Sequence, residues 1–154
     1  MSLILTVPQG YGYVVLSAAA TFWVANWQGI RTTHFRQDAG VPYPHPYASA
    51  SQMASATPDQ KQKMYLFNCS QRAHANFLEN QPSLLAALLI AGLRYPVAAS
   101  ALGLGWTLSR ILYAVGYTRP SSTEGKGRLW GGAFWLCQWA LFGLATFVGY
   151  KMVV

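Results

Sequence analysis

The chain has 154 residues, enough for one domain, and it is 53% hydrophobic but only 10% charged. A typical soluble domain carries roughly 25% charged residues, so this composition favours a membrane protein. The net charge is +7, yet most of the few basic residues lie between apolar runs. Membrane topology signals have that distribution, and it argues against a nucleic-acid-binding surface.

Apolar runs divide the sequence into four candidate membrane helices within a single domain covering residues 1–154. We expect helices at about 11–30, 64–93, 97–117 and 129–150, joined by polar loops at about 31–63 and 118–128. Each run approaches or exceeds the roughly 20 residues that a transmembrane helix needs. The predicted fold class is therefore an all-α membrane protein with a four-transmembrane-helix bundle.

The loops between these runs differ in charge. Seven basic residues lie in or beside the first and third loops, namely Arg31, Arg36, Lys61, Lys63, Arg119, Lys126 and Arg128. On the other side are two, Arg94 and Lys151. Cytoplasmic loops carry an excess of Lys and Arg, so we expect the loops at 31–63 and 118–128 to face the cytoplasm.

The second predicted helix carries polar residues where a membrane helix is usually apolar. Asn68, Arg72, Asn76 and Glu79 follow one another at spacings of four, four and three, which places them on one helical face. His74 lies on an adjacent face. Charged groups at membrane depth are costly, so this face must meet a protein interior, a partner or a water-filled site.

The third predicted helix offers a second polar face, formed by Arg110, Tyr113 and Tyr117 at spacings of three and four. The two faces approach the same side of the membrane, where Arg31 and Arg128 also end their helices. Guanidinium groups bind carboxylates bidentately and keep their charge when buried. An excess of arginines therefore predicts an anionic ligand.

Glu79 and Asn76 offer groups that would receive an ammonium or an amide. A small peptide with carboxylates and one amine fits the whole pattern. The competing interpretation is structural, because Arg72 and Glu79 would also suit an ion-pair network between helices or subunits. His74 would then be a packing residue, and the histidines of the first loop show no metal-ligand spacing, so we expect no metal.

Three segments resemble the membrane-associated eicosanoid and glutathione metabolism (MAPEG) family. They are YGYVVLSAAATFWVA, FNCSQRAHANFLENQP with its RAxxN…E…P pattern, and ALGLGWTLSRILYAVGY. The resemblance covers nearly the whole chain and is closest to the type 3 microsomal glutathione S-transferases. Asn80 stands where leukotriene-C synthase has a tyrosine, which also favours the type 3 branch.

The resemblance implies a homotrimer that binds glutathione between neighbouring subunits near the cytosolic face. By motif position, the implied glutathione-binding residues are Arg31, Arg72, His74, Asn76, Glu79, Arg110, Tyr113 and Tyr117. Relatives have a thiolate-stabilising arginine just after the third helix. The loop differs in length here, so Arg128 is the first choice for that catalytic role and Lys126 the second.

These roles predict a glutathione transferase or glutathione peroxidase that attacks a lipophilic electrophile or a lipid hydroperoxide arriving from the bilayer. The resemblance also implies a multi-pass protein of the endoplasmic reticulum membrane in a eukaryote, with its active site toward the cytosol. Two alternatives stay open. One is a non-catalytic lipid-binding member like the lipoxygenase-activating protein, and the other is a small channel or transporter subunit with a polar pore face.

Overall fold

A computed structural model describes residues 7–121 and 124–154, and its regular elements in this part of the chain are all helical. The elements are α1 (Tyr11–Ala39), α2 (Ala50–Ser55), α3 (Pro58–Gly92), α4 (Pro96–Tyr117), a 3₁₀ helix η1 (Lys126–Gly131) and α5 (Phe134–Val153). The predicted all-α class is confirmed. The predicted loop at 118–128 includes residues 122 and 123, which lie outside the described residues.

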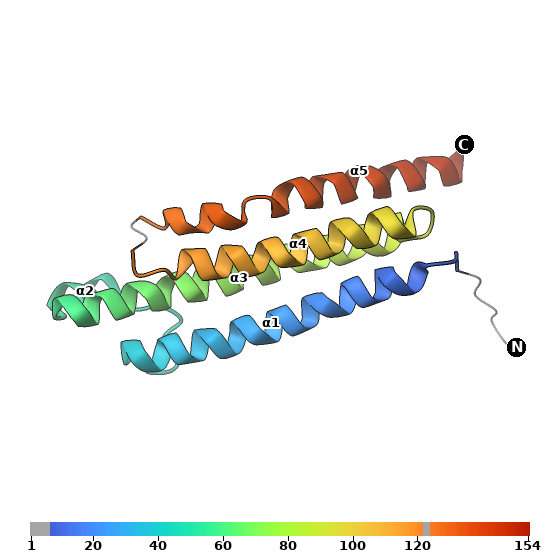
Figure 1. The fold of residues 1–154 in the computed structure, drawn as a ribbon. Helices are drawn as coiled ribbons and strands as arrows, with labels where there is room; N and C mark the ends of the chain where they lie inside the picture. Colours follow the sequence, from blue (N-terminus) through green and yellow to red (C-terminus); the bar gives the residue numbers. More distant parts are fainter. Residues whose placement is uncertain (1–6, 122–123) are drawn as a thin grey trace, which may run out of the picture.

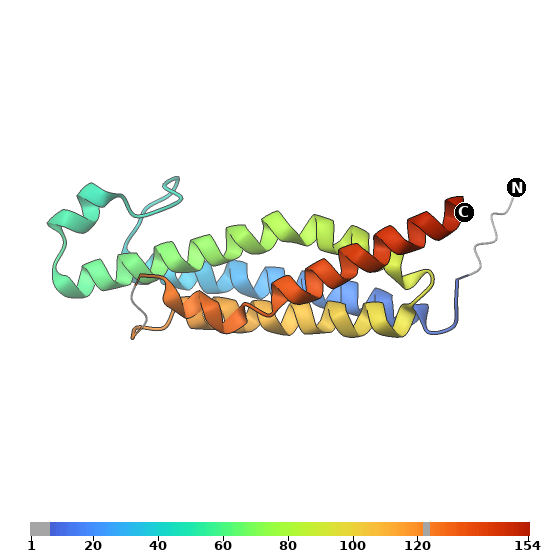
Figure 2. The same ribbon diagram turned by 90° about the horizontal axis from the view of Figure 1, so that it is seen from above.

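Four long helices, α1, α3, α4 and α5, lie side by side along one axis (Figure 1). The pair α3 and α4 forms the middle, with α1 packed on one side of it and α5 on the other (Figure 1). Seen from above, α5 crosses in front of this pair and α1 lies behind it (Figure 2). The core between them contains Phe77, Leu84, Trp106 and Phe134, all fully buried or nearly so. One end of the molecule carries α2 and the connections beside it, and the other carries the α3–α4 turn and the C-terminus (Figure 1).

The helix boundaries near the first loop differ from the prediction. Residues 31–39 continue α1 instead of forming a loop, and α1 ends at Gly40, whose φ is 62°. Residues 58–63 already belong to α3, which begins after Thr57, whose side chain accepts a hydrogen bond from the Gln60 N–H. The sequence prediction stopped each helix at the first charges, where a membrane span would end. A helix ends at its caps instead, so it runs on past the first charges.

The start of the last long helix also differs from the prediction. Residues 126–131 form η1, and α5 begins at Phe134 and not at residue 129. The glycines around this position explain the difference. Gly131 packs so closely on α4 that a Cβ there would collide with the Ser109 carbonyl and the Tyr113 backbone. The tight 3₁₀ turn keeps that close approach before the α-helix starts.

The connection between α1 and α2 is held on α3 by two side chains. The guanidinium of Arg36 donates to the His45 carbonyl at 2.6 Å and lies over the rings of Tyr43 and Phe67. The amide of Asn68 accepts from the Ala48 N–H at 2.8 Å and donates to the Ala48 carbonyl at 3.0 Å. This connection is therefore packed one helical turn before Arg72.

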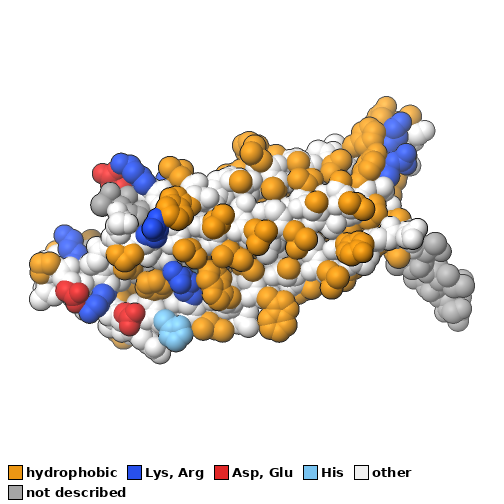
Figure 3. Space-filling model, viewed as in Figure 1, with side chains coloured by type: hydrophobic (Ala, Val, Ile, Leu, Met, Phe, Trp, Pro, Cys, Tyr) orange, Lys and Arg blue, Asp and Glu red, His pale blue; other side chains and the backbone are white. Residues whose placement is uncertain are grey.

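The surface along the long helices is strongly apolar. Leu16, Trp23, Leu108, Leu136 and Trp139 are all more than half exposed. On the face shown in Figure 3, hydrophobic side chains cover the middle, and charged side chains gather mostly toward the end that carries α2. Such large exposed apolar areas mark contact with lipid or with another chain.

Among the described helices, α5 alone is long and apolar enough to cross a membrane by length and composition. The other three long helices carry the polar residues described below, which lowers their mean hydropathy. The four transmembrane spans expected from the sequence therefore stay a prediction.

Candidate functional site

The polar face of α3 carries an ion pair. Arg72 and Glu79 lie two turns apart on the helix, and the guanidinium donates to both carboxylate oxygens, at 2.8 Å and 3.3 Å. Their side chains are 48% and 53% exposed. An ion pair exposed to water contributes little to the stability of the fold. On an apolar surface, however, such a pair favours contact with a polar partner.

Asn76 joins the α3 face to α4. Its side-chain oxygen accepts a hydrogen bond from Arg110 Nη1 at 2.9 Å, and its Nδ2 donates to Glu79 Oε2 at 3.5 Å. Arg72, Glu79, Asn76 and Arg110 therefore form one continuous chain of hydrogen bonds. The structure brings these four predicted site residues together.

Arg110 is fully buried and lies among aromatic rings. Its guanidinium carbon is 4.3 Å from the centroid of Phe134 and 4.6 Å from that of Tyr113. Tyr113 in turn packs edge-on against Tyr117 with the ring centroids 5.5 Å apart. The Nε and Nη2 atoms of Arg110 have no hydrogen-bond partner among the described residues. Buried polar groups are normally paired, so these two donors point to a ligand or water in the functional protein.

Arg128 reaches the same region from η1. A pocket of about 240 Å³ is lined by Asn76, Tyr113, Arg128, Leu129, Gly132, Phe134 and Trp135. The guanidinium of Arg128 donates to the Gly125 carbonyl at 3.2 Å and lies 6.0 Å from the centroid of Tyr117. The close approach of η1 to α4 at Gly131 sets this position. A cation, an amide and a phenol therefore surround one small pocket with an apolar wall.

Lys126, the second choice for the catalytic role, lies apart from this pocket. Its ammonium pairs with the Glu124 carboxylate at 2.7 Å, and its side chain is 70% exposed. Of the two candidates, Arg128 is the one that lines the pocket with Asn76 and Tyr113.

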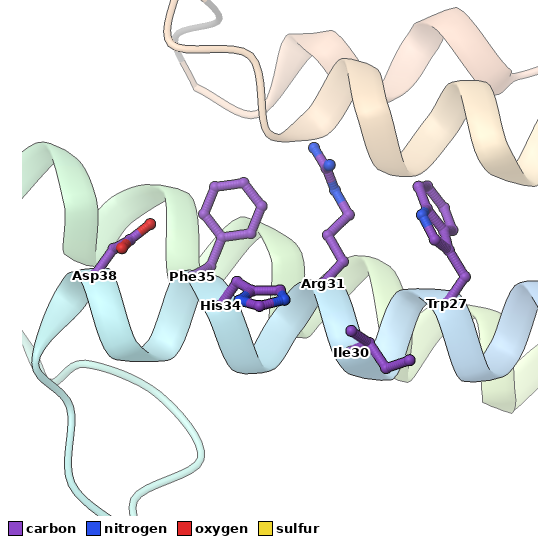
Figure 4. A pocket seen from close by; sticks show the side chains of 6 residues that line it. All are labelled: Trp27, Ile30, Arg31, His34, Phe35 and Asp38. Atoms are coloured by element: carbon purple, nitrogen blue, oxygen red, sulfur yellow. The ribbon is translucent and has the colours of Figure 1, made fainter.

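Arg31 lies in a different region. Its Nη2 donates to Thr118 Oγ1 at 2.6 Å, and the guanidinium packs between the rings of Trp27 and Phe35. It lines a pocket of about 390 Å³ on α1, together with Trp27, Ile30, His34, Phe35 and Asp38 (Figure 4). Within one chain, Arg31 therefore does not meet the cluster around Asn76.

His74 and Asn68 also face away from that cluster. The His74 ring packs beside Gly29 of α1, and its Nδ1 atom is buried without a hydrogen-bond partner in the described part of the chain. Asn68, predicted to share the polar face of Arg72, instead binds the backbone of Ala48. The helical spacing predicts the shared face of α3, but different neighbouring helices and loops contact different residues of that face.

Sequence reasoning missed an amide network that joins α3, α4 and α5. Gln138 on α5 is 3% exposed, accepts from Trp106 Nε1 at 2.9 Å and donates to Asn80 Oδ1 at 3.2 Å. The signal was present, because Gln138 is the only amide in the apolar stretch from 129 to 150. Amide side chains in membrane helices form hydrogen bonds between helices.

The fold and the candidate site together describe an all-helical protein with a strongly apolar surface, whose polar cluster lies on two adjacent helices and holds more cations than carboxylates. The chain matches the model of the MAPEG family over residues 12–147, and it therefore belongs to that family. Members of this family are integral membrane proteins. The family includes glutathione transferases and peroxidases as well as non-catalytic members.

Proposed function

We propose that this protein is a glutathione-dependent membrane transferase or peroxidase that activates glutathione as a thiolate. The observation that carries this proposal is the pocket shared by Asn76, Tyr113 and Arg128 beside the buried Arg110. Family membership supports the choice of glutathione as the ligand.

The chemistry of the site suits glutathione, a tripeptide with two carboxylates and one amine. Arg110 has two buried donors without a partner among the described residues, and these donors can bind one carboxylate of the ligand. Arg72 uses one edge of its guanidinium for Glu79, and its other edge can bind the second carboxylate. The Glu79 carboxylate suits the ligand's ammonium, and Asn76 and Tyr113 offer hydrogen bonds to its amide groups. Tyr117 packs against Tyr113 and lies near Arg128, behind the residues that line the pocket.

In this proposal Arg128 stabilises the thiolate. A free thiol has a pKa of about 8.5, so little thiolate is present at neutral pH. A guanidinium beside the sulfur in a partly dry pocket favours the anion, and each unit by which the pKa falls corresponds to about 1.4 kcal/mol. The proton leaves to solvent at the end of the molecule where η1 lies.

Two reactions follow from one thiolate. In conjugation, the sulfur attacks an electrophilic carbon, a C–S bond forms and the leaving group departs, or an epoxide opens. In peroxide reduction, the sulfur attacks the terminal oxygen of a lipid hydroperoxide and the O–O bond breaks. The lipid alkoxide takes a proton from solvent and leaves as the alcohol. The resulting glutathione sulfenic acid then reacts with a second glutathione to give the disulfide and water. The apolar wall formed by Leu129, Phe134 and Trp135 suits either lipophilic substrate.

We further propose that the working unit is a homotrimer. The resemblance implies a site between subunits, and two features support it. The Arg72–Glu79 pair is half exposed on long helices whose surface is strongly apolar, and Arg31 lies in a separate pocket on α1. In the trimer, Arg31 and His74 of one subunit would approach glutathione held by α3 and α4 of its neighbour. For a eukaryotic source, we propose the endoplasmic reticulum membrane as the location, with the glutathione site toward the cytosol.

One observation favours a second candidate, a non-catalytic lipid-binding member of the family. The Arg72–Glu79 pair satisfies its own charges without a ligand, as a structural ion pair would. In that case the apolar surface would hold a lipid, and the chain would not bind glutathione.

A glutathione titration of the detergent-purified protein, followed by thiolate absorbance in the ultraviolet, separates these functions. We expect a saturable thiolate signal. Arg128→Ala should remove it and lower turnover roughly a hundredfold or more, as for other groups that stabilise a developing or resting anion, while glutathione affinity changes little. Lys126→Ala is the matched control, because it removes a neighbouring cation outside the pocket.

Loss of the thiolate signal in Lys126→Ala, with the signal intact in Arg128→Ala, would reverse the assignment of the catalytic cation. If the unmodified protein does not bind glutathione at all, the lipid-binding function replaces the enzymatic one.

A further inference from the structure

The α3 turn that carries the proposed glutathione contacts lacks one backbone hydrogen bond. Pro82 lies inside α3 and has no N–H, so the carbonyl of Leu78 loses its usual helical donor. Asn76 and Glu79 lie in the turn just before this gap. The orientation of that turn therefore depends on side-chain contacts as well as on the helix itself.

Neighbouring helices hold this turn from several sides. Gln81 Nε2 donates to Thr21 Oγ1 of α1 at 3.0 Å. Arg110 of α4 donates to the side chain of Asn76 at 2.9 Å. Asn80 Nδ2 donates to the backbone carbonyl of Asn76 at 2.8 Å, and this amide is the point where α5 joins.

Gln138 of α5 holds Asn80 in place. Its Nε2 donates to Asn80 Oδ1 at 3.2 Å, and its Oε1 accepts from Trp106 Nε1 at 2.9 Å. Because the indole has only a donor, Trp106 fixes which way the Gln138 amide points. Trp106 and Arg110 are one turn apart on α4. The α4 helix therefore contacts this part of α3 in two ways, directly through Arg110 and indirectly through Trp106 and Gln138 of α5.

Packing alone would not require an amide at this position. Gln138 is almost completely buried in a helix made mostly of apolar residues, where leucine or methionine would fill the space without polar atoms to satisfy. Among the described residues, its side chain bonds to Asn80, beside the turn that presents Asn76 and Glu79, and to Trp106, one helical turn from Arg110. We propose that Gln138 is a positioning residue for the glutathione site, acting through Asn80, and this inference rests on the proposed function.

Gln138→Met tests the inference in the full-length, detergent-purified chain. Methionine keeps the length of the side chain and removes both hydrogen bonds. We expect the dissociation constant for glutathione to rise roughly tenfold, within the range measured for residues coupled in one hydrogen-bond network. At saturating glutathione the thiolate fraction should equal that of the unmodified protein, because Gln138 does not reach the pocket of Arg128.

Thr146→Val is the matched control. It removes a polar side chain from the same helix, and the described contact of that side chain is with its own helix, at the Phe142 carbonyl. Its glutathione affinity should be unchanged. Trp106→Phe keeps an aromatic ring in the core and removes the indole donor together with part of the ring volume, and we expect it to weaken binding about threefold.

Unchanged glutathione affinity in Gln138→Met would overturn the inference, and so would a thiolate fraction that falls at saturation. If Gln138→Met does not fold, judged by size-exclusion chromatography, Trp106→Phe decides, and unchanged affinity there also overturns it. The unmodified protein separates this failure from failure of the proposed function. If it binds no glutathione, the proposed function is wrong and the positioning role is rejected with it.

Discussion

Two arginines of the candidate site, Arg72 and Arg110, lie in opposite environments, although both bond to the same short stretch of α3. Arg72 is half exposed and its charge is met by the Glu79 carboxylate. Arg110 is fully buried, bonds only to a neutral amide among the described residues, and keeps two donors unpaired. Arg72 is therefore satisfied without a ligand, whereas Arg110 is not. The buried arginine is the stronger indication that this face binds an anion.

Arg110→Met should give the largest effect. The change removes a buried cation with two unpaired donors, each costing about 1–3 kcal/mol, and leaves an apolar side chain among aromatic rings. We expect glutathione affinity to fall roughly a hundredfold, as for removal of a buried charge partner, while the melting temperature of the ligand-free chain stays level or rises. Isothermal titration calorimetry and thermal unfolding in detergent measure the two quantities.

Arg72→Met is the matched comparison on the exposed side of the site. It should also weaken glutathione binding, but it should change stability by no more than about 1 kcal/mol, because exposed ion pairs contribute little. A large drop in the melting temperature for Arg110→Met would identify Arg110 as a structural residue, and the contrast between the two arginines would disappear.

Gly131→Ala should have an intermediate effect by moving η1. A Cβ at this position would collide with the Ser109 carbonyl and the Tyr113 backbone, so η1 must shift away from α4 and carry Arg128 with it. We expect turnover to fall roughly tenfold, since small displacements of a catalytic group are costly, with a loss of about 1–3 kcal/mol in stability from overpacking. Steady-state kinetics and chemical unfolding would measure both.

Gly143→Ala supplies the control for that prediction. A Cβ at Gly143 of α5 would meet nothing within 4 Å in the described chain, and alanine favours a helix over glycine. Activity should be unchanged there. Equal losses of turnover in both variants would show that the distance between η1 and α4 does not set the position of Arg128.

The fold was largely predictable because hydrophobic runs separated by charged loops dominate this sequence. Helix ends were not, since they depend on local caps. The αL glycine at Gly40 and the Thr57 cap extend α1 and α3 beyond the expected spans. A rule based on membrane thickness ends a helix at its first charge, whereas backbone hydrogen bonding continues until a cap ends it.

The part of the site that lies on a single helix was predictable from the sequence. The spacing of Arg72, Asn76 and Glu79 correctly placed these residues on one face. Contacts between helices were less predictable. Nothing in the spacing indicates that Asn68 serves the first connection, or that Gln138 reaches Asn80. Sequence periodicity identifies a polar face, but the neighbouring helix determines what that face binds.

Arg31→Ala should have the smallest effect. This variant tests whether the pocket on α1 that contains Arg31 contributes to glutathione binding, as the pocket of Arg128 is proposed to do. Arg31 lies on α1, bonded to Thr118 and outside the cluster around Asn76. If it contacts glutathione of a neighbouring subunit, its loss should weaken binding about fivefold, which matches the roughly 1 kcal/mol that a typical hydrogen bond contributes. Thr118→Val keeps the arginine and should leave affinity unchanged.

Co-expression of Arg31→Ala and Arg72→Ala chains should then restore part of the binding, because a mixed trimer can place an intact Arg31 beside an intact Arg72. Binding that stays as weak in the mixture as in the separate variants would place Arg31 outside the glutathione site.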